Sequence, residues 1–260
     1  MSSKTKEETS SRDYVNSFAR GLEVIRVFTR AKPRMTLSEV AKATDMTRAT
    51  ARRFLLTLVQ EGYMESDNKH FMLRPKVLDL GYSVLSSMEI WDVAQPIMQE
   101  LADKLQECCF AVVLQEHSVI YTARATSNRY VSVGISVGSR VPAHTVSSGR
   151  VLLAALSEEE LLKYLDEAEL VKYTPNTITS KVKLKSEIDQ TRLDGWAIVD
   201  QELEIGLRSI SVPIKDATGR VVAALNVPCP SARISFDEMR TRVLTELMTA
   251  SNRITAGLMR

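Results

Sequence analysis

Several signals that would assign this 260-residue chain to a particular class are missing from its sequence. It has no apolar run of about 18 residues and no secretory h-region near its start, so we expect a cytoplasmic protein without a membrane partner. It has only three cysteines, Cys108, Cys109 and Cys229, and their spacing suits neither a metal site nor a disulfide framework. A 44% share of hydrophobic residues is nevertheless ample for a buried core.

Signatures of common enzyme classes are also missing. The sequence has no G-x-S-x-G elbow, no Walker loop, no dinucleotide fingerprint and no metal-ligand cluster. We therefore expect a protein that is not an enzyme and that needs no cofactor and no metal. A hydrolytic enzyme built on Ser147 and His144 is the remote alternative, and ester turnover that Ser147→Ala abolishes would support it.

The net charge of +2 conceals an uneven distribution along the chain. Residues 1–76 carry 15 Lys and Arg against 9 Asp and Glu, whereas residues 77–260 carry 19 against 23. The first part therefore has a net charge of +6 and the second a net charge of −4. A basic N-terminal third indicates contact with a polyanion, and the mildly acidic remainder indicates another role.

The N-terminal third has the pattern of a winged helix-turn-helix. Residues 1–12 are polar and expected to be disordered, and the domain is predicted over residues 13–75. Its first helix, which should bury Val15, Phe18 and Leu22, ends before the Lys32-Pro33 pair. TLSEVAKAT then forms a short helix capped by Thr36 or Ser38, and a tight turn follows. GYMESDNKHFML supplies two short strands, which form the wing.

The segment TRATARRFLLTLVQE is the predicted recognition helix, capped by Thr47. The second helix of a helix-turn-helix lies in the major groove, where arginine forks match guanine edges and phosphate oxygens. Helical geometry turns Ala51 and Leu55 to the core and leaves Arg48 and Arg52 outward. A solvated helix face, or a winged helix used only for protein contacts, is the alternative. The predicted DNA-binding residues are Ser38, Thr47, Arg48, Thr50, Arg52, Arg53 and Lys69.

The rest of the chain predicts a linker helix over residues 76–92 and a second domain over residues 93–260. A helix is expected after Pro96, and hairpins and further helices follow, ending in a long amphipathic helix with Phe236 and Met239 on its inner side. Antiparallel hairpins beside several helices favour an α+β sensor-like domain over a doubly wound sheet.

Two sets of motifs resemble one known family. TLSEVAKATDMTRATARRFLLTLVQEGYM, together with VPAHTVSSGRVLLAAL and VDQELEIGLRSISVP, is similar to the IclR family of bacterial transcriptional regulators, most of all to its PcaR/PobR-type subgroup. The resemblance covers nearly the whole chain from Arg12. It implies a winged helix-turn-helix, a linker helix that dimerises, and a GAF-like domain that binds a small metabolite. It further implies a homodimer, or a homotetramer, on a double-stranded DNA operator, with contact to RNA polymerase as one mode of action.

The resemblance also points to an effector pocket, and the residues themselves favour an organic acid. Hydroxyls and N–H groups at a helix start attract anions, which suits a carboxylate at Ser147 and Ser148. Compared with other members of the family, the pocket is less polar at Val199 and Pro228, which favours an aromatic or dicarboxylic acid over a small keto acid. The resemblance to the PcaR/PobR-type subgroup implies control of β-ketoadipate catabolism. A different carbon-source pathway with a non-aromatic acid is the alternative. The predicted effector-binding residues are Arg124, His144, Ser147, Ser148, Val199, Ser209, Asn226 and Pro228.

Two of these assignments, and a nearby acidic group, have competing interpretations. Arg124 fits an interface salt bridge equally well, and His144 fits a hydrogen bond to a backbone carbonyl. The carboxylates of Asp200, Glu202 and Glu204 are more typical of structure than of catalysis, and Arg208 is their expected ion-pair partner.

Overall fold

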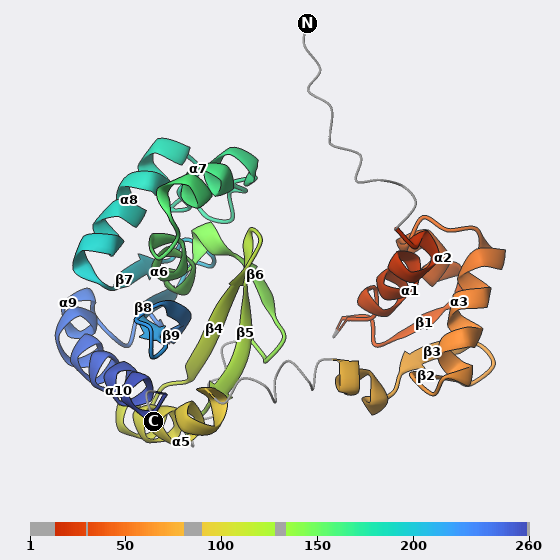
Figure 1. Cartoon of the computed structure of the whole chain (residues 1–260), viewed down its shortest axis with the longest axis horizontal. Coiled ribbons are helices and arrows are strands. Elements are labelled where there is room, and N and C mark those ends of the chain that lie inside the picture. The colour runs from red at the N-terminus through yellow and green to blue at the C-terminus, as the bar shows by residue number, and fades with distance from the viewer. Residues whose placement is uncertain (1–13, 30, 81–89, 128–133, 259–260) are drawn as a thin grey trace, which may run out of the picture. The chain divides into compact units, whose positions relative to one another are not determined.

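The computed structural model describes residues 14–29, 31–80, 90–127 and 134–258, and these form two compact units (Figure 1). The units comprise residues 1–87 and residues 88–260. Most of the predicted linker helix, including Val84, Leu85 and Met88, lies outside the described residues. The linker and its role in dimerisation therefore remain proposals.

The N-terminal unit contains, within its described residues, the three helices α1, α2 and α3 and a small sheet. Its elements are α1 (Asn16–Arg26), β1 (Arg34–Thr36), α2 (Leu37–Ala43), α3 (Arg48–Gln60), β2 (Met64–Ser66), β3 (His70–Leu73) and the 3-10 helix η1 (Pro75–Leu78). The sheet order is β1-β3-β2, and both pairings are antiparallel. Val24, Val40, Ala51, Leu55 and Met64 are almost fully buried in its core.

Helix ends in this unit largely follow the expected chemistry. Thr36 caps α2 in a reciprocal capping box with Glu39, so the cap is Thr36 and Ser38 stays exposed. The turn between α2 and α3 holds Asp45 at a φ of 48°, a left-handed value that an aspartate tolerates. Gly62 takes a φ of 77° after α3, where a residue with a Cβ would be strained.

One prediction for this unit was wrong, and one strand was not predicted. Val15 and Phe18 of the first-helix segment are 62% and 68% exposed, and Val24 is the buried residue of α1 instead. The sheet also has a third strand, β1, in which Met35 pairs with Phe71 of the wing. Three residues are too few to show a strand pattern, so β1 is specified by its tertiary partner.

The C-terminal unit is built on one six-stranded antiparallel sheet of order β6-β5-β4-β9-β8-β7. Its elements are α5 (Ile90–Leu105), β4 (Cys109–Gln115), β5 (Ser118–Ala125), β6 (Arg140–Pro142), the 3-10 helix η2 (Ala143–Thr145), α6 (Ser147–Ala154), α7 (Glu158–Glu167), α8 (Lys181–Asp194), β7 (Ala197–Asp200), β8 (Leu207–Lys215), β9 (Val221–Pro230), α9 (Phe236–Glu238), the π-helix η3 (Met239–Val243) and α10 (Leu244–Gly257). The unit is α+β, as the sequence predicts.

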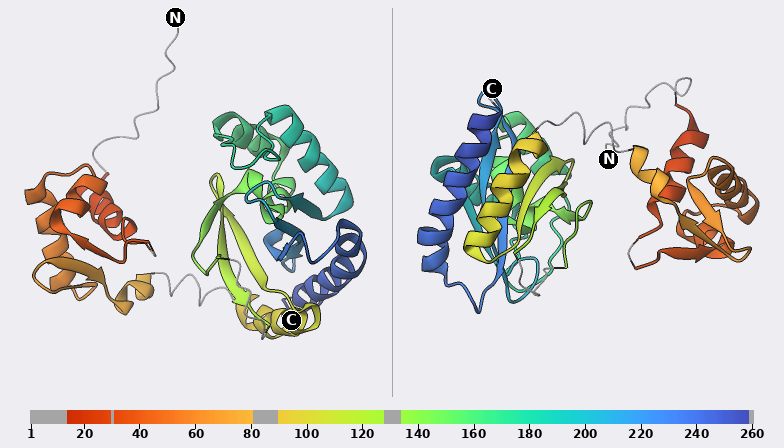
Figure 2. Two further views of the ribbon diagram at one scale, coloured as in Figure 1. Left: turned by 180° about the vertical axis from the view of Figure 1, so that it is seen from behind. Right: turned by 90° about the horizontal axis from the view of Figure 1, so that it is seen from below.

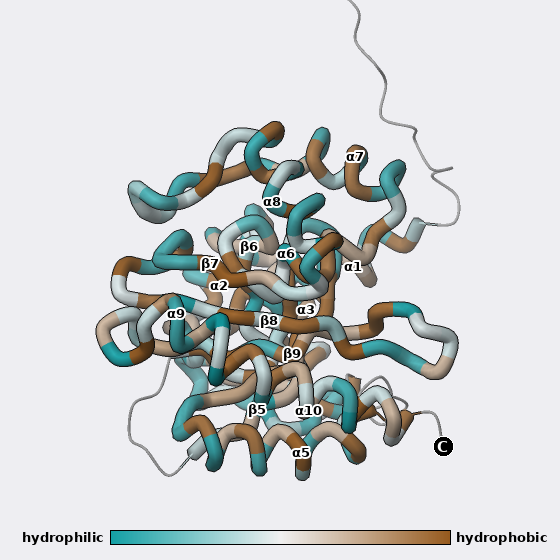
Figure 3. Tube along the Cα trace, turned by 90° about the vertical axis from the view of Figure 1, so that its left-hand side faces the viewer, coloured by the Kyte–Doolittle hydropathy of each residue, from teal (hydrophilic) through white to brown (hydrophobic). Residues whose placement is uncertain are grey.

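Helices cover both faces of this sheet. Helices α5 and α10 lie side by side on one face, and α6 packs on the other face with α7 and α8 beyond it (Figures 1 and 2). Helix α5 alternates hydrophobic and hydrophilic residues along its length, as expected for a helix with one buried side (Figure 3). The sheet therefore has a hydrophobic core on each face. The face that α6 covers also carries the buried polar side chains Ser147, Ser209 and Asn226.

Two helices of this unit differ from the prediction. Helix α5 begins at Ile90 and contains Pro96, although a helix was expected only after that proline. Burial of Ala94 and Met98 outweighs the one hydrogen bond that the proline cannot donate. At the other end, Met239 is buried as predicted, whereas Phe236 is 42% exposed. No helix among the described residues is long and apolar enough to cross a membrane.

Candidate functional site

The start of α3 presents a polar and basic surface. Thr47 caps the helix by accepting a hydrogen bond from the Thr50 N–H at 3.2 Å, and the two hydroxyls are 2.9 Å apart. Arg48 and Arg52 are exposed, while Ala51 is fully buried. The arginines expected to face outward therefore do so, and the helix is anchored by its apolar side.

The other predicted DNA-binding residues lie around this helix. Arg53 is also exposed but lies on the flank of α3 that faces α1, beside Asn16 and Arg20. Ser38 is exposed on α2, and Lys69 is exposed in the wing. All seven residues thus belong to one small unit, and their contact with DNA is a prediction.

Asp67 fixes the shape of the wing turn. Its carboxylate accepts hydrogen bonds from the backbone N–H groups of His70 at 2.7 Å and Lys69 at 3.1 Å, and it pairs with Arg34. These hydrogen bonds, of which the one from His70 is the strongest, hold the pKa of Asp67 well below its usual value. Asn68 takes a φ of 72° in this turn, a left-handed value that an asparagine tolerates, and Lys69 beside it is exposed.

A buried cluster of hydroxyl and amide groups lies where α6 meets the sheet. The Ser147 hydroxyl donates to Ser209 Oγ at 2.9 Å and lies 2.8 Å from Ser211 Oγ. Asn226 Nδ2 donates to the oxygens of Ser147 at 3.1 Å and of Ser211 at 2.9 Å. All four side chains are at most 7% exposed. Three predicted effector residues therefore meet, joined by Ser211.

Ser211 was missed by the sequence analysis, although a usable signal was present. It lies two residues after Ser209 on β8, and alternate residues of a strand point to the same face of a sheet. An isolated serine in the apolar run ISVPI is therefore a polar residue on the same sheet face as Ser209, the face that α6 covers.

Two buried polar atoms, one in this cluster and one on the residue that follows Ser147, have no hydrogen-bond partner among the described residues. They are Ser148 Oγ and Asn226 Oδ1, and both residues are at most 1% exposed. The phenol of Tyr121 lies near Ser148; burial raises its pKa to about 12, and the Ser148 hydroxyl opposes that shift. An unsatisfied buried polar group costs about 1–3 kcal/mol, so each of these two atoms is suited to contact with a polar atom of a ligand.

The sheet face beneath α6 is apolar around this cluster. Val199, Ser209 and Pro228 lie opposite one another on β7, β8 and β9, and residues paired in this way share a face. In the next row, Phe110 pairs with Asn226, and its ring is packed on another aromatic ring of the same core. The site therefore combines hydroxyls, an amide and an aromatic wall.

Arg124 and His144 have partners other than the serine cluster. The Arg124 guanidinium lies over the Phe110 ring and 3.8 Å from the Cys108 sulfur, and its Nε has no partner among the described residues. The His144 Nε2 lies 3.1 Å from the carbonyl oxygen of Val171. Burial lowers the pKa of His144, which favours a neutral ring. Effector contact by these two residues remains a prediction.

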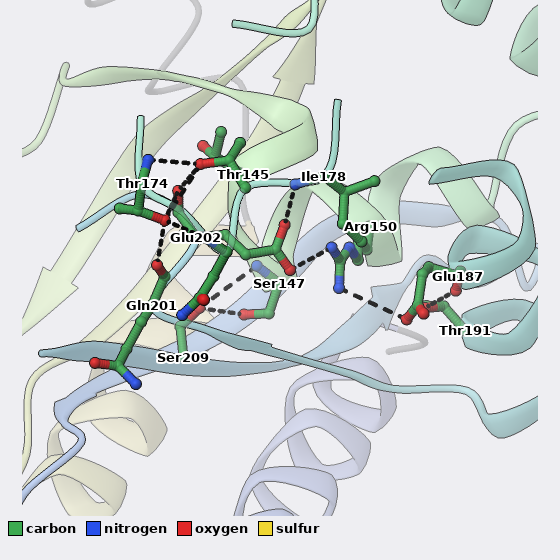
Figure 4. Close-up of polar contacts among 12 residues, drawn as sticks. Thr145, Ser147, Arg150, Thr174, Ile178, Glu187, Thr191, Gln201, Glu202 and Ser209 are labelled. Atoms are coloured by element: carbon green, nitrogen blue, oxygen red, sulfur yellow. Dashed lines mark hydrogen bonds and ion pairs between the residues drawn. The ribbon is translucent and has the colours of Figure 1, made fainter. Parts of the chain in front are cut away.

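A buried ion pair links α6 to the loop that follows β7. Arg150 Nη2 donates to Glu202 Oε1 at 2.6 Å, and both side chains are less than 10% exposed (Figure 4). Glu202 Oε2 also accepts the Ile178 N–H at 3.2 Å, and Glu187 lies 3.8 Å from the same guanidinium. Sequence reasoning missed Arg150, which stands out only as a charge within an apolar helix.

The acidic segment before β8 serves this framework. Arg208 forms a two-pronged ion pair with Asp200, at 2.7 and 3.1 Å, as predicted, whereas Glu202 pairs with Arg150 instead. In the part of the chain that the structure describes, no three His, Cys, Asp or Glu side chains converge as metal ligands would.

Comparison with known proteins agrees with this two-domain description. Residues 17–68 match the IclR helix-turn-helix domain, and residues 82–256 match the C-terminal domain of bacterial transcriptional regulator IclR. The chain is 43% identical to the Pca regulon regulatory protein of Pseudomonas putida, over 94% of this chain and 84% of that protein.

Solved structures show the same likeness. One is a transcriptional regulator from Rhodococcus sp. RHA1, at 46% identity and a TM-score of 0.83, over 94% of this chain and 98% of that one. Another is the inducer-binding domain of an Acinetobacter PobR double mutant in complex with 3-hydroxybenzoic acid. That domain is 31% identical, with a TM-score of 0.60, over 63% of this chain and 96% of its own. The chain belongs to the IclR family of bacterial transcriptional regulators.

Proposed function

We propose that this regulator controls genes of aromatic-acid catabolism in the β-ketoadipate pathway and senses a small aromatic carboxylic acid in its C-terminal unit. The names of two similar proteins support the pathway, since one is a Pca regulon regulator and the other carries a hydroxybenzoic acid in its inducer-binding domain. The chemistry of the buried cluster supports the ligand class independently.

The observation that carries this proposal is the pair of unpartnered polar atoms beside an aromatic wall. Ser148 Oγ can donate to a carboxylate, and Asn226 Oδ1 can accept from a ring hydroxyl. No side chain caps α6, so the partial positive charge at its start is also available to an anion. Phe110 and Val199 then offer apolar surface to the ring.

The DNA half of the proposal assigns α3 to the major groove. Arg48 and Arg52 would contact base edges or phosphates, and Lys69 of the wing would contact the backbone. A homodimer would place two such helices on half-sites about one helical turn apart, and a tetramer would double the number of sites. Acid binding would then shift the balance between arrangements of these helices, which alters operator affinity or recruitment of RNA polymerase.

We further infer that the chain acts by binding, without catalysis. The polar cluster uses Ser147 as a hub among three neutral groups, and the His144 ring is directed to a carbonyl of the loop. That arrangement gives the serine no base. Hydrolysis of an ester panel at a rate that Ser147→Ala reduces would contradict this inference.

Ser148→Ala tests the effector site with little risk to the fold. Since this hydroxyl has no hydrogen-bond partner, its removal should leave thermal stability unchanged or slightly higher. A hydrogen bond to a charged group contributes about 1.5–3 kcal/mol, so the affinity for an aromatic acid should fall roughly tenfold to a hundredfold. Calorimetric titration with hydroxybenzoic, dicarboxylic and short keto acids measures this effect.

Ser186→Ala is the matched control, because Ser186 is exposed on α8. It should bind every acid as the unchanged protein does. Binding of short keto acids in preference to aromatic ones would replace the aromatic assignment with another carbon-source pathway. Equal affinity of Ser148→Ala and the unchanged protein would remove α6 from the site.

A further inference from the structure

A groove between α1 and α3 carries two positive charges. It has a volume of about 420 Å³ and opens beside the recognition helix. It is lined by Asn16, Ser17, Arg20, Thr50, Arg53, Phe54 and Thr57. This lining contains two guanidinium groups, two threonine hydroxyls and one serine hydroxyl, but no carboxylate.

Neither arginine of the groove is neutralised within the described part of the protein. Arg20 and Arg53 take part in no ion pair there, whereas Arg34 of the same unit is paired with Asp67. Two like charges that face one groove repel each other, and an anion placed between them removes that repulsion. Arginine forks and short hydroxyls together are donors that match the oxygens of a phosphate group.

The start of α1 adds to this positive potential. Val15 occupies the cap position, so no side chain satisfies the first N–H groups of the helix, and its first turn contains no acidic residue. Asn16 and Ser17, the first two residues of α1, line the groove. The partial positive charge of the helix end is therefore directed to the place where the two guanidiniums lie.

The position of the groove relative to α3 indicates which phosphate it meets. Thr50, Arg53 and Thr57 follow a spacing of three and four residues and so share one flank of the helix. At about 100° per residue, Arg52 lies roughly 100–160° and Arg48 roughly 140–180° around the helix from them. A helix about 10–12 Å in diameter fills a major groove about 12 Å wide. Its flank therefore lies against the phosphate backbone when its outer face reads the bases.

We propose that the α1–α3 groove binds one phosphodiester of the DNA backbone beside the major groove, clamped between Arg20 and Arg53. Ser17 donates a hydrogen bond to the same phosphate, whereas the Thr57 hydroxyl donates to the Arg53 carbonyl oxygen at 2.9 Å and so holds the helix flank in place. This assignment rests on the proposed DNA binding and adds α1, which the helix-turn-helix pattern alone does not include. It also gives Arg53 a different task from Arg48 and Arg52, because a phosphate contact positions the protein without reading sequence.

Salt dependence of DNA affinity is the decisive measurement. A duplex selected by the unchanged protein from random sequence, and an unrelated duplex of equal length, are titrated between 50 and 200 mM salt. Each phosphate contact contributes about −0.9 to the slope of log affinity against log salt concentration. The Arg20→Gln/Arg53→Gln double variant should therefore make the slope shallower by about 0.9 on both duplexes. The ratio of the affinity of the unchanged protein to that of the double variant should therefore be about threefold smaller at 200 mM salt than at 50 mM salt.

Arg26→Gln provides the matched control, since Arg26 is exposed on the same helix but does not line the groove. It should leave the slope unchanged, and circular dichroism should report folded domains for all variants. The single variants Arg20→Gln and Arg53→Gln should each change the slope by no more than the double variant, because both residues hold one phosphate.

Three outcomes would overturn the clamp. The first is a slope change in Arg20→Gln no larger than in Arg26→Gln. The second is a slope change of about 1.8 in the double variant, which indicates two separate phosphates. The third is a rise in melting temperature with inorganic phosphate, at matched ionic strength, that Arg20→Gln abolishes while its DNA affinity stays unchanged. That result would assign the groove to a free anion. Failure of the unchanged protein to bind any selected duplex would instead contradict DNA binding itself.

Discussion

Glu202→Ala should destabilise the C-terminal unit far more than most single substitutions. The change removes the carboxylate that lies 2.6 Å from the Arg150 guanidinium and also accepts the Ile178 N–H. Both charged side chains are less than 10% exposed, so the arginine would remain buried without its main counter-charge. Breaking a buried pair in this way costs about 3–5 kcal/mol. The Glu187 carboxylate, which is half exposed and lies 3.8 Å from the same guanidinium, would still offset part of the buried charge. The loss of stability should therefore lie toward the lower end of this range.

Differential scanning calorimetry of the full chain checks this magnitude. For a unit of 150–250 residues, each kcal/mol lowers the melting temperature by about 2–4 °C, so the transition of residues 88–260 should fall by roughly 6–20 °C. Glu187→Ala is the control and should cost less than about 1 kcal/mol, because an exposed ion pair at this distance is weak. The double change Arg150→Met/Glu202→Leu should recover most of the loss. A Glu202→Ala protein that melts within 2 °C of Glu187→Ala would refute the reasoning.

Two further predictions concern the framework around the sites. Gly149→Ala should destabilise the C-terminal unit by at least about 2 kcal/mol in denaturant titrations, because a Cβ there would lie 1.9 Å from the Ala143 carbonyl oxygen. Gly21→Ala, whose nearest contact would be 3.8 Å away, should be neutral or stabilising in the same assay. In the wing, Asp67→Ala should speed amide hydrogen exchange at His70, measured by NMR. The fold of the wing lowers the pKa of Asp67 from 3.8, so the carboxylate should contribute its full stabilisation of the wing above about pH 3.8. That stabilisation should be lost as the pH falls below 3.8 through the lowered pKa.

The recognition helix was predictable because its signals are local. Thr47 as cap, the alternation of Ala51 and Leu55 with arginines, and Gly62 after the helix all lie within 16 residues of one another. Each acts through the geometry of a single helix, so no knowledge of distant residues is required. The antiparallel hairpins and the charge difference between the two parts of the chain were visible for the same reason.

The polar centre of the second unit required the tertiary structure. Ser147 lies 62 residues before Ser209 and 79 before Asn226 in the chain, and only the packing of α6 on the sheet brings them within hydrogen-bond distance. Arg150 likewise finds Glu202 across 52 residues. Family resemblance pointed to several of these positions, but which polar atoms are satisfied and which are not follows from the packing alone.

The same division explains the errors and the new proposal. By itself, the sequence determined the helices, the caps and the basic character of the first domain, because these depend on neighbours along the chain. It misplaced Phe18 and missed β1, since burial and short-strand pairing depend on what lies opposite. The facing of Arg20 and Arg53 across one groove is likewise a property of how α1 packs on α3. Local interactions set the elements, and long-range packing decided which side chains they bring together.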